Sequence, residues 1–428
     1  MQLIDQICSL ILTVLTVLTA YQTFYAILGF FARARRWPEA PQTRRYAVLI
    51  AARNEARVID GLLDSIHAQT YPADRIEIFV VADNCSDDTA AICRAHGATV
   101  YERKDPVHAR KGYAMQFLVD CIHRDYGTDA FDGYFVFDAD NLLAADFIER
   151  MNEAFAAGHH VVTSYRNTKN FGTNLVSSAY GIHFYRNTVV FHRPRSVLGL
   201  GTHLTGTGYL LDASLLADGW QWTNLTEDDE LTCVLSKKGE LVAYCEAAEF
   251  FDEQPIDFRT ALRQRVRWAR GRLVNFVRNG WHIPSEIFHS ENGLRGSISS
   301  YDHFFHYFPH GLFTFLIGLV YPAVSFIYGL VHPGVNDYSA MAWNLLALFG
   351  SKYLAALATG LMAVLREWRH IHCSPVKRLL YALTYPWFPM ISVFIYMVAL
   401  VHDVRWTPIA HTDHSTIDDL TRPTIRHT

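Results

Sequence analysis

The segment YAVLIAARNEA, residues 46–56, decides the fold of this chain. Its first seven residues form an apolar run with the length of a buried strand, and polar residues follow directly. Two further short apolar runs, IEIFVVA at residues 76–82 and YFVF at residues 134–137, also end in polar residues. Helices are expected after each run, over residues 55–68 and 87–96 and from residue 145. Strands that alternate with helices predict a parallel α/β sheet covered on both faces.

The residues just after these strands are the first candidates for a site, because ligands bind beyond the carboxyl ends of such strands. They are Asn54 and Glu55 after the first run, Asp83 after the second, and Asp138 and Asp140 after the third. Two carboxylates at i and i+2 suit a hard cation such as Mg²⁺, whose shell is completed by phosphate oxygens and water. A DxD tripeptide also occurs in solvated turns, and the buried strand before it favours the metal site.

Residues 226–230, TEDDE, allow two compatible interpretations. Thr226 can cap a helix whose first turn holds the acids, where the helix macrodipole stabilises negative charge. One of the acids can also act as a general base toward an acceptor hydroxyl. A capped helix start can position such a base, so the pattern predicts both.

Residues 258–281 have the pattern of an amphipathic helix. Apolar residues recur at helical spacing from Phe258 to Phe276, and four arginines line another face. This pattern is typical of a helix that lies on anionic lipid at a membrane interface. Membrane binding does not explain Gln264 and Trp268, which are therefore candidate functional residues.

Composition predicts a membrane protein with a large soluble domain. Of the 428 residues, 50% are hydrophobic and 19% charged, and the mean hydropathy is +0.05. The uncharged run over residues 6–32 is long enough to span a bilayer. Arg33, Arg35 and Arg36 follow it, which places the next segment in the cytoplasm.

Three more apolar runs follow the soluble region. Residues 311–331 and 340–365 are long enough to span, and the second contains Lys352. The loop between them has no Lys or Arg, whereas residues 366–378 are basic, so the first loop is expected outside and the second inside. The run over residues 379–401 is interrupted by Pro386 and Pro389. It either spans, or bends back at these prolines and returns the chain to the cytoplasm.

Other features narrow the class of protein. The net charge of −4 gives no sign of a nucleic-acid-binding protein. The seven cysteines form no CxxC pair, which fits reduced thiols in a cytosolic domain. The 21 histidines are dispersed along the sequence and are interpreted as polar surface and interfacial side chains.

The chain is therefore expected to have five regions. They are an N-terminal transmembrane helix (1–32), a cytoplasmic α/β domain (46–257), amphipathic interfacial helices (258–300), a membrane region with two or three spans (301–403) and a tail (404–428). If the last apolar run bends back, the tail is cytoplasmic, and we expect His411 or Trp406 at the mouth of the active site. The alternative is a fourth true span with the tail outside.

Seven motifs together resemble a known family. They are ARNEA (52–56), VVADNCSDDT (80–89), KGYAM (111–115), DAD (138–140), GTG (206–208), TEDDE (226–230) and QRVRW (264–268). Their types and order are similar to those of membrane-integrated family 2 glycosyltransferases, the group of cellulose, hyaluronan and poly-N-acetylglucosamine synthases. The resemblance covers residues 46–271. It implies an α/β GT-A (Rossmann-like) domain inserted between transmembrane helices, with an amphipathic interfacial helix.

The resemblance also implies roles for individual residues. Asp228 matches the catalytic base, and Asp138 and Asp140 match the motif that holds Mg²⁺ or Mn²⁺. The residues implied to bind the nucleotide sugar are Asn54, Glu55, Asp83, Lys111, Asp138 and Arg267. Those implied to contact the acceptor are Gly206, Thr207, Gly208, Glu227, Gln264 and Trp268. Many relatives have two acids where this chain has Ala82 and Asp83.

The function implied first is inverting sugar transfer from a nucleotide sugar, UDP-glucose or UDP-N-acetylglucosamine, to extend a β-linked polysaccharide. One alternative is transfer of a single sugar to a membrane lipid such as a polyprenyl phosphate or a ceramide-like acceptor. Another is a non-catalytic subunit of glycan assembly. The expected location is the plasma membrane, with several spans and the active site facing the cytoplasm. The expected partners are the donor, a glycan or lipid acceptor and membrane lipid, but no nucleic acid; a homo-oligomer or an accessory export subunit is left open.

Overall fold

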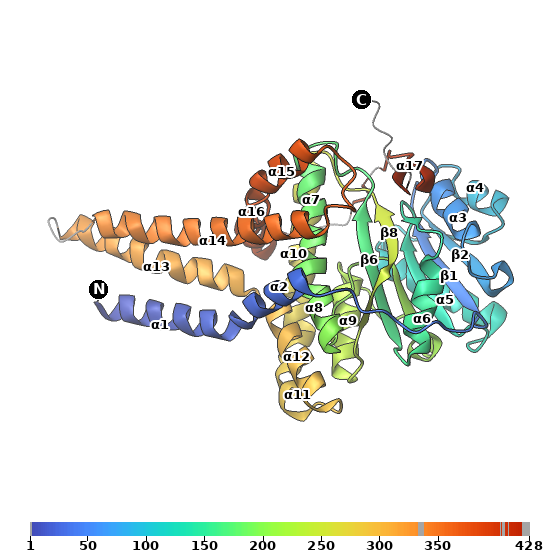
Figure 1. Cartoon of the computed structure of the whole chain (residues 1–428), viewed down its shortest axis with the longest axis horizontal. Coiled ribbons are helices and arrows are strands. Elements are labelled where there is room, and N and C mark those ends of the chain that lie inside the picture. Colours follow the sequence, from blue (N-terminus) through green and yellow to red (C-terminus); the bar gives the residue numbers. More distant parts are fainter. Residues whose placement is uncertain (1, 333–337, 403, 405–406, 410, 422–428) are drawn as a thin grey trace.

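The computed structural model describes residues 2–332, 338–402, 404, 407–409 and 411–421. Figure 1 shows three long helices that project together from one side of an α/β domain: α1 (Gln2–Thr19), α13 (His310–Val331) and α14 (Tyr338–Arg366). Helices α7 (Leu175–Arg186) and α10 (Phe258–Asn279) lie between them and the sheet and run across their direction. The molecule thus has a membrane-like part, a layer of crossing helices and a sheet domain.

The sheet domain has eight strands in the part of the chain that the structure describes, in the order β3-β2-β1-β4-β7-β6-β8-β5. The strands are β1 (Tyr46–Ala52), β2 (Ile76–Asp83), β3 (Thr99–Arg103), β4 (Gly133–Asp138), β5 (Leu142–Leu143), β6 (Val161–Thr168), β7 (Tyr209–Asp212) and β8 (Ala243–Asp252). The half that contains β1 to β4 is parallel throughout. This half holds the three strands that the sequence predicts, with at most one residue of difference at each end.

The other half of the sheet is mixed, so the prediction of a purely parallel sheet is wrong there. Strand β7 is antiparallel to both β4 and β6, while β6 and β8 are parallel. An apolar run indicates that a strand is buried but does not indicate its direction. The helical segment between β6 and β7 leaves the chain at the end of the sheet where β6 ends, so β7 runs back antiparallel to it.

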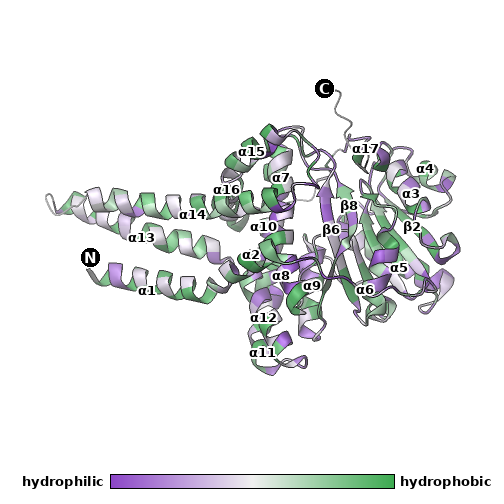
Figure 2. Cartoon of the chain, in the orientation of Figure 1, coloured by the Kyte–Doolittle hydropathy of each residue, from purple (hydrophilic) through white to green (hydrophobic). Residues whose placement is uncertain are grey.

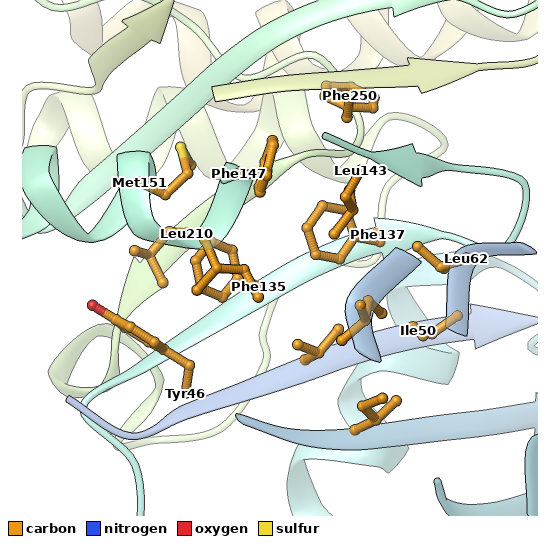
Figure 3. Packing of buried hydrophobic residues seen from close by; sticks show 14 of the residues in the cluster. Tyr46, Ile50, Leu62, Phe135, Phe137, Leu143, Phe147, Met151, Leu210 and Phe250 are labelled. Carbon is orange, nitrogen blue, oxygen red and sulfur yellow. The ribbon is translucent and has the colours of Figure 1, made fainter. Parts of the chain in front are cut away.

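Both faces of the sheet are covered, as predicted. Figure 3 shows one face, where aromatic side chains such as Phe135, Phe137 and Phe147 pack between β4 and the helices α3 (Ile59–His67) and α6 (Phe147–Ala156). The other face packs against α5 (Lys111–Tyr126) and α9 (Glu227–Lys237). Buried Tyr46 donates from its hydroxyl to Asn152 Oδ1 at 2.7 Å, so its polar atom is satisfied inside the core.

Shorter elements complete the domain and the crossing layer. They are α2 (Tyr21–Phe31), α4 (Thr89–Ala95), α8 (Arg193–Leu198), α11 (Ile283–His289), α12 (Gly293–Tyr307), α15 (Pro375–Thr384), α16 (Trp387–Val401), α17 (Ile417–Thr421), the π-helix η2 (Asn187–His192) and the 3-10 turns η1 (Ala73–Arg75), η3 (Ala213–Leu216) and η4 (Gly280–His282). The π-helix joins α7 to α8, and such π segments are frequent at functional sites.

Four helical segments among the described residues are long and apolar enough to cross a membrane: Leu3–Phe31, His310–Val331, Met341–Arg366 and Pro375–Val401. Figure 2 shows apolar residues along most of α1, α13 and α14. The first segment is divided at Ala20 into α1 and α2, although its sequence predicts one helix.

The fourth segment is interrupted at Pro386, the first of the two prolines that the sequence analysis noted in residues 379–401. It consists of α15 and α16, with Tyr385 and Pro386 between them. Helix α16 has 15 residues, about 22 Å, which is less than the roughly 30 Å of hydrocarbon in a bilayer. It lies along α10, where the Arg265 guanidinium donates to Phe388 O at 2.6 Å and to Ser392 Oγ at 2.7 Å.

The described part of the tail lies against the α/β domain. The backbone N–H groups of Thr412 and Asp413 each donate to Glu253 Oε2 at 3.0 Å, and Leu420 of α17 packs on Leu142 and Phe251. The tail is therefore on the same side of the projecting helices as the domain, which is the arrangement that a returning chain requires. His411 is described, and Trp406 lies outside the described residues.

Candidate functional site

A cavity of about 490 Å³ opens at the carboxyl ends of β1, β2 and β4 and continues to the helices beside the membrane segments. Its wall includes most of the residues that the sequence singles out: Glu55, Asp83, Lys111, Asp138, Asp140, Gly206, Glu227, Asp228, Gln264, Arg267, Trp268 and His411. Asn54, Thr207 and Gly208 are not on this wall. The size is typical of a cavity that binds a small-molecule ligand.

At one end of the cavity, Asp83 is held between two guanidinium groups. Arg53 pairs with Asp83 Oδ2 and Arg103 donates to Asp83 Oδ1 at 2.7 Å. Asp83 is 4% exposed, so its oxygens have a fixed direction. Asn84 Nδ2 also donates to Asp83 Oδ1 at 2.9 Å. This end therefore offers a rigid, charge-balanced polar surface.

Asn54 joins the loops after β1 and β2 instead of facing the cavity. It has a φ of 58°, and its Oδ1 accepts from the Ser86 N–H at 2.8 Å. Asn84, at the end of β2, also has a positive φ, 54°. Asparagine tolerates the left-handed region better than most residues, which explains its presence at both turns. The structure thus gives Asn54 a supporting position.

The DAD segment follows β4, and Lys111 neutralises its first acid. Lys111 Nζ lies 2.5 Å from Asp138 Oδ1, 2.8 Å from Gly206 O and 3.6 Å from Glu227 Oε1. Burial alone would lower the pKa of Lys111, but the carboxylates of Asp138 and Glu227 more than offset this, so its pKa is raised and the ammonium stays charged. Lys111 thus links the DAD segment to the TEDDE acids.

The second acid of the segment, Asp140, faces the C-terminal tail. Its Oδ2 accepts from the Glu253 N–H at 2.9 Å. His411 Nδ1 lies 3.0 Å from Glu55 Oε2, and although burial opposes it, Asp140 and Glu55 raise the pKa of His411 to about 10. Burial would raise the pKa of Asp140, yet His411 and Lys169 hold it below its usual value. The tail therefore places a cation beside the DAD segment, where the sequence predicts His411.

Asp138 and Asp140 are suitable ligands for one divalent cation. Both residues lie on the loop after β4 and line the cavity. Asp138 is partly exposed there, and a hydrogen bond from the Glu253 N–H fixes one carboxylate oxygen of Asp140. No group of three or more His, Cys, Asp or Glu side chains within the described ranges is arranged as a complete protein cage for a metal ion. Mg²⁺ and its analogues use one or two protein carboxylates with phosphate oxygens and water, so two ligands fit this chemistry.

The acids of residues 226–230 begin helix α9, as the sequence predicts. Thr226 is at the N-cap position but makes no side-chain capping hydrogen bond, so that part of the prediction is wrong. Asp228 lines the cavity, and burial together with Asp229 raises the pKa of Asp228 well above that of an ordinary aspartate. Burial raises the pKa of Glu227 as well. A carboxyl group with a raised pKa in a cavity is a strong candidate for a base near neutral pH.

The GTG segment positions the backbone next to Asp228. A Cβ on Gly206, which has a φ of 87°, would lie 3.7 Å from Asp228 Oδ2, and one on Gly208 would lie 2.3 Å from the Phe250 ring. Thr207 is fully buried between them and donates to Asn141 Oδ1 at 2.5 Å. Its hydroxyl also accepts from the Asp138 N–H at 2.8 Å. Thr207 therefore supports the DAD loop from inside the protein, and the acceptor contact expected of Thr207 and Gly208 stays a prediction.

Three residues of the QRVRW segment, Gln264, Arg267 and Trp268, face the cavity from α10. Arg267 donates to Leu225 O at 2.8 Å. Burial raises the pKa of Asp228, and the positive charge of Arg267 opposes part of that rise. Trp268 lines the cavity, and its ring centroid lies 5.7 Å from that of Tyr180. Gln264 Oε1 is buried and has no hydrogen-bond partner among the described residues. These three side chains leave hydrogen-bonding and stacking capacity for a ligand.

The structure adds cavity residues that the sequence analysis missed. Arg166 donates from Nε to Asp252 Oδ2 at 2.8 Å and from Nη1 to Thr205 O at 2.7 Å. Burial raises the pKa of Asp252 to about 6, although Arg166 opposes the shift. Asp252 ends β8. The strand-end rule applied to β1, β2 and β4 would have found it, had β8 been recognised as a strand.

A group of histidines at the other end of the cavity was also missed. His183, His203, His306 and His310 line it, and His192 and His303 are buried behind them. The interpretation of the histidines as surface and interfacial residues is therefore wrong for His192, His203 and His303. A signal was available in DHFFHYFPH, where His303 and His306 have i, i+3 spacing and so lie on neighbouring turns of α12, and His310 begins the next helix.

Comparison with known proteins identifies the domain. The profile described as Glycosyltransferase like family 2 matches residues 41–271. A probable glycosyltransferase, YdaM of Bacillus subtilis, is 27% identical over 256 residues, which cover 58% of this chain and 60% of that protein. A beta-monoglucosyldiacylglycerol synthase of Synechocystis is 28% identical over 238 residues, which cover 54% of this chain and 48% of that protein. The chain therefore spans about half to three fifths of these curated relatives.

A solved structure shares the fold. A mannosyltransferase from Pyrobaculum calidifontis, in complex with GDP-Man and Mn²⁺, superposes with a TM-score of 0.55 at 16% identity. The superposition covers 90% of this chain and 98% of that one. At this level of identity the likeness concerns the fold alone, a GT-A-like mixed sheet with helical additions.

Proposed function

Because the chain belongs to glycosyltransferase family 2, we propose that it transfers one sugar from a nucleotide sugar to a lipid acceptor in the membrane, with inversion at the anomeric carbon. The donor is proposed to be UDP-glucose or UDP-N-acetylglucosamine. The domain is proposed to face the cytoplasm at the plasma membrane, in line with the arginines after the first span. The name of the Synechocystis relative, a diacylglycerol glycoside synthase, supports a lipid acceptor.

One observation carries the choice of a lipid acceptor. The cavity that holds Asp83, Asp138 and Asp228 is also lined by Gln22 of the first membrane segment and His310 of the second. An acceptor anchored in the bilayer can therefore reach the base without leaving the membrane. Extension of a polysaccharide, the other acceptor class, requires a path for the polymer as well.

The proposed chemistry is a single displacement. Asp228 accepts the proton of the acceptor hydroxyl while that oxygen attacks the anomeric carbon from the face opposite the nucleotide. Arg267 and Lys111 stabilise negative charge on the departing diphosphate. A divalent cation held by Asp138 and Asp140 would neutralise further charge there. Trp268 offers an apolar face to the acceptor or the transferred sugar.

Product analysis tests this function. The full chain is purified into nanodiscs that contain diacylglycerol or undecaprenyl phosphate, and radiolabelled UDP-glucose, UDP-N-acetylglucosamine and GDP-mannose are added in turn. We expect label in a lipid that carries one sugar, and Asp228→Asn as the matched control should give none. A ladder of soluble or lipid-linked polymer would replace the proposed function with chain extension. Absence of nucleotide release from every donor would favour a non-catalytic subunit.

A further inference from the structure

The membrane end of the cavity is built around two stacked imidazoles. The rings of His203 and His306 have centroids 4.1 Å apart and an interplanar angle of 27°. Phe191, from the π-helix η2, lies with its centroid 4.4 Å from that of His203. All three side chains line the cavity, together with Gln22 and Phe305. The rings at this end therefore form an aromatic wall that carries imidazole nitrogens.

The hydrogen bonds of the histidine group divide it into two kinds. His303 uses both ring nitrogens, toward Ser236 Oγ at 3.2 Å and Thr202 O at 2.9 Å, and His192 Nδ1 lies 2.6 Å from Thr202 Oγ1. The hydrogen bonds of these two rings therefore link parts of the protein to one another. His203 Nδ1 and His306 Nε2, in contrast, are buried and have no hydrogen-bond partner within the described part of the chain.

An unpartnered buried nitrogen is costly unless a ligand or water satisfies it. Both rings are neutral, because burial, with the nearby Arg272 guanidinium, places the pKa of His203 and that of His306 well below the usual value. A neutral imidazole has one N–H donor and one acceptor nitrogen. A hydroxyl group both donates and accepts, so it matches either nitrogen of either ring.

The charges around this pair argue against an anionic ligand. Arg195 lies 3.0 Å from Asp302, and both side chains are 1% exposed. Arg272 lies 3.7 Å from Asp229. The guanidinium groups beside the imidazoles thus already face carboxylates. Arg186, on another part of the wall, donates to Thr359 Oγ1 at 3.2 Å and has no carboxylate partner among the described residues, so its guanidinium remains available to a phosphate group.

We propose that His203 and His306 form a head-group subsite that binds an uncharged, hydroxyl-bearing lipid acceptor such as the glycerol of a diacylglycerol. This inference rests on the proposed function and specifies its acceptor. The imidazoles hold the head group by hydrogen bonds, while Phe191 and Phe305 pack against the start of the acyl chains. The two histidines are positioning residues, and the proton is still taken by Asp228.

Substitution of the two rings tests the subsite. In His203→Phe and His306→Phe the ring stays but its nitrogens are lost, whereas His203→Gln keeps a donor and an acceptor. The full chain is assayed in nanodiscs with dioleoylglycerol and UDP-glucose, and nucleotide release without an acceptor is measured in parallel. We expect each Phe variant to raise the KM for dioleoylglycerol about 5- to 10-fold, the effect of one lost hydrogen bond. Acceptor-independent release should stay within about twofold, and His203→Gln should restore part of the affinity.

The control is His192→Phe, which removes a hydrogen bond within the protein, not one toward the cavity. It should lower thermal stability and leave the KM for dioleoylglycerol within about twofold. Wild-type KM in both cavity variants, with active wild-type protein, would overturn the subsite and leave the proposed function intact. If Arg186→Gln raised the KM for undecaprenyl phosphate while His203→Phe did not, the acceptor would be a phosphate lipid. Failure of the wild type to glycosylate any lipid, despite nucleotide release, would overturn the proposed function itself.

Discussion

The two ends of the cavity differ in how they are built. The end around Asp83, Asp138 and Asp140, which we propose binds the donor and call the donor end, consists mainly of residues that end strands of one sheet. Its charges are paired over short distances, as Asp83 is with Arg53 and Arg103. The membrane end is assembled mainly from α2, α7, η2, α10 and α12, and it combines imidazoles and aromatic rings with arginines, of which Arg195 and Arg272 face carboxylates. The first end suits a charged nucleotide, and the second suits an uncharged acceptor. Asp228 lines the same cavity between these two ends. We therefore expect the two substrates to meet there.

This difference explains what the sequence could predict. The carboxyl ends of parallel strands meet at one sheet edge, so a short apolar run followed by Asp or Asn predicts a site from local sequence alone. That reasoning placed Asp83, Asp138 and Asp140 on the cavity wall. No comparable local rule brings His203 and His306 together, because they are far apart in sequence and meet only through the packing of α12 on the domain.

The sequence also did not settle the positions of Thr207 and of the C-terminal tail, and both have local causes. Thr207 lies within a motif whose glycines line or border the site, but the positive φ of Gly206 and Gly208 turns the Thr207 side chain into the protein. The tail could be placed only as one of two alternatives, because hydropathy does not distinguish a span from a bent pair of helices of the same length. The break at Tyr385 and Pro386 and the contact of Thr412 with Glu253 support the returning chain.

The largest expected effect lies where the two ends meet. Asp228→Asn should lower the rate of transfer by on the order of 10²-fold or more, because an amide of the same shape cannot accept a proton. The affinity for the donor, measured by calorimetry, should change little. Because the pKa of Asp228 is raised, the wild-type rate should fall with decreasing pH well before the value of about 4 at which an ordinary aspartate protonates. Wild-type turnover in this variant would remove Asp228 from the mechanism.

The donor end should depend on a divalent cation. Chelation by EDTA should abolish transfer, and Mg²⁺ or Mn²⁺ should restore it. Asp140→Asn should raise the metal concentration needed for half-maximal rate about tenfold or more, since one of two protein ligands is weakened. Asp74→Asn, at an exposed carboxylate outside the cavity, is the control and should behave like the wild type. Full activity after exhaustive chelation would contradict a metal at this end.

The tail should contribute to the donor end by a smaller factor. His411→Phe removes the cation beside Glu55 and Asp140, so we expect a rise in donor KM of about tenfold, the effect of one charge-assisted hydrogen bond. The same loss is expected when the chain is ended after Val404. Ser415→Ala, farther along the tail, should leave the donor KM near the wild-type value.

The side of the tail is tested separately. A cysteine is introduced by Thr412→Cys in a background that lacks Cys8, Cys85 and Cys373. Intact cells are then treated with a membrane-impermeant thiol reagent. Protection of this cysteine, with labelling after the cells are opened, is expected for a tail on the cytoplasmic side. Labelling of intact cells would place the tail, and the domain it contacts, outside.

The membrane end should be sensitive to the packing of α2. A Cβ on Gly29 would lie 1.7 Å from Val189 O of the π-helix, so Gly29→Ala forces α2 and η2 apart. We expect a loss of about 1–3 kcal/mol in stability, as for other overpacked contacts, and a higher KM for the acceptor with an unchanged donor affinity. Gly311→Ala is the control, because its Cβ would meet nothing within 4 Å. If Gly29→Ala and Gly311→Ala changed thermal unfolding and the acceptor KM equally, the close contact of Gly29 with Val189 would not shape the membrane end.

Photo-crosslinking in nanodiscs tests most directly that one cavity joins a nucleotide end to a membrane end. A diacylglycerol with a diazirine close to its glycerol is activated by light in the presence of the full chain, and labelled peptides are identified by mass spectrometry. We expect labelling within residues 183–206 and 301–310, reduced by excess dioleoylglycerol and unaffected by UDP. Labelling confined to the outer surfaces of α1, α13 and α14, with none in these two segments, would contradict a membrane acceptor in the cavity.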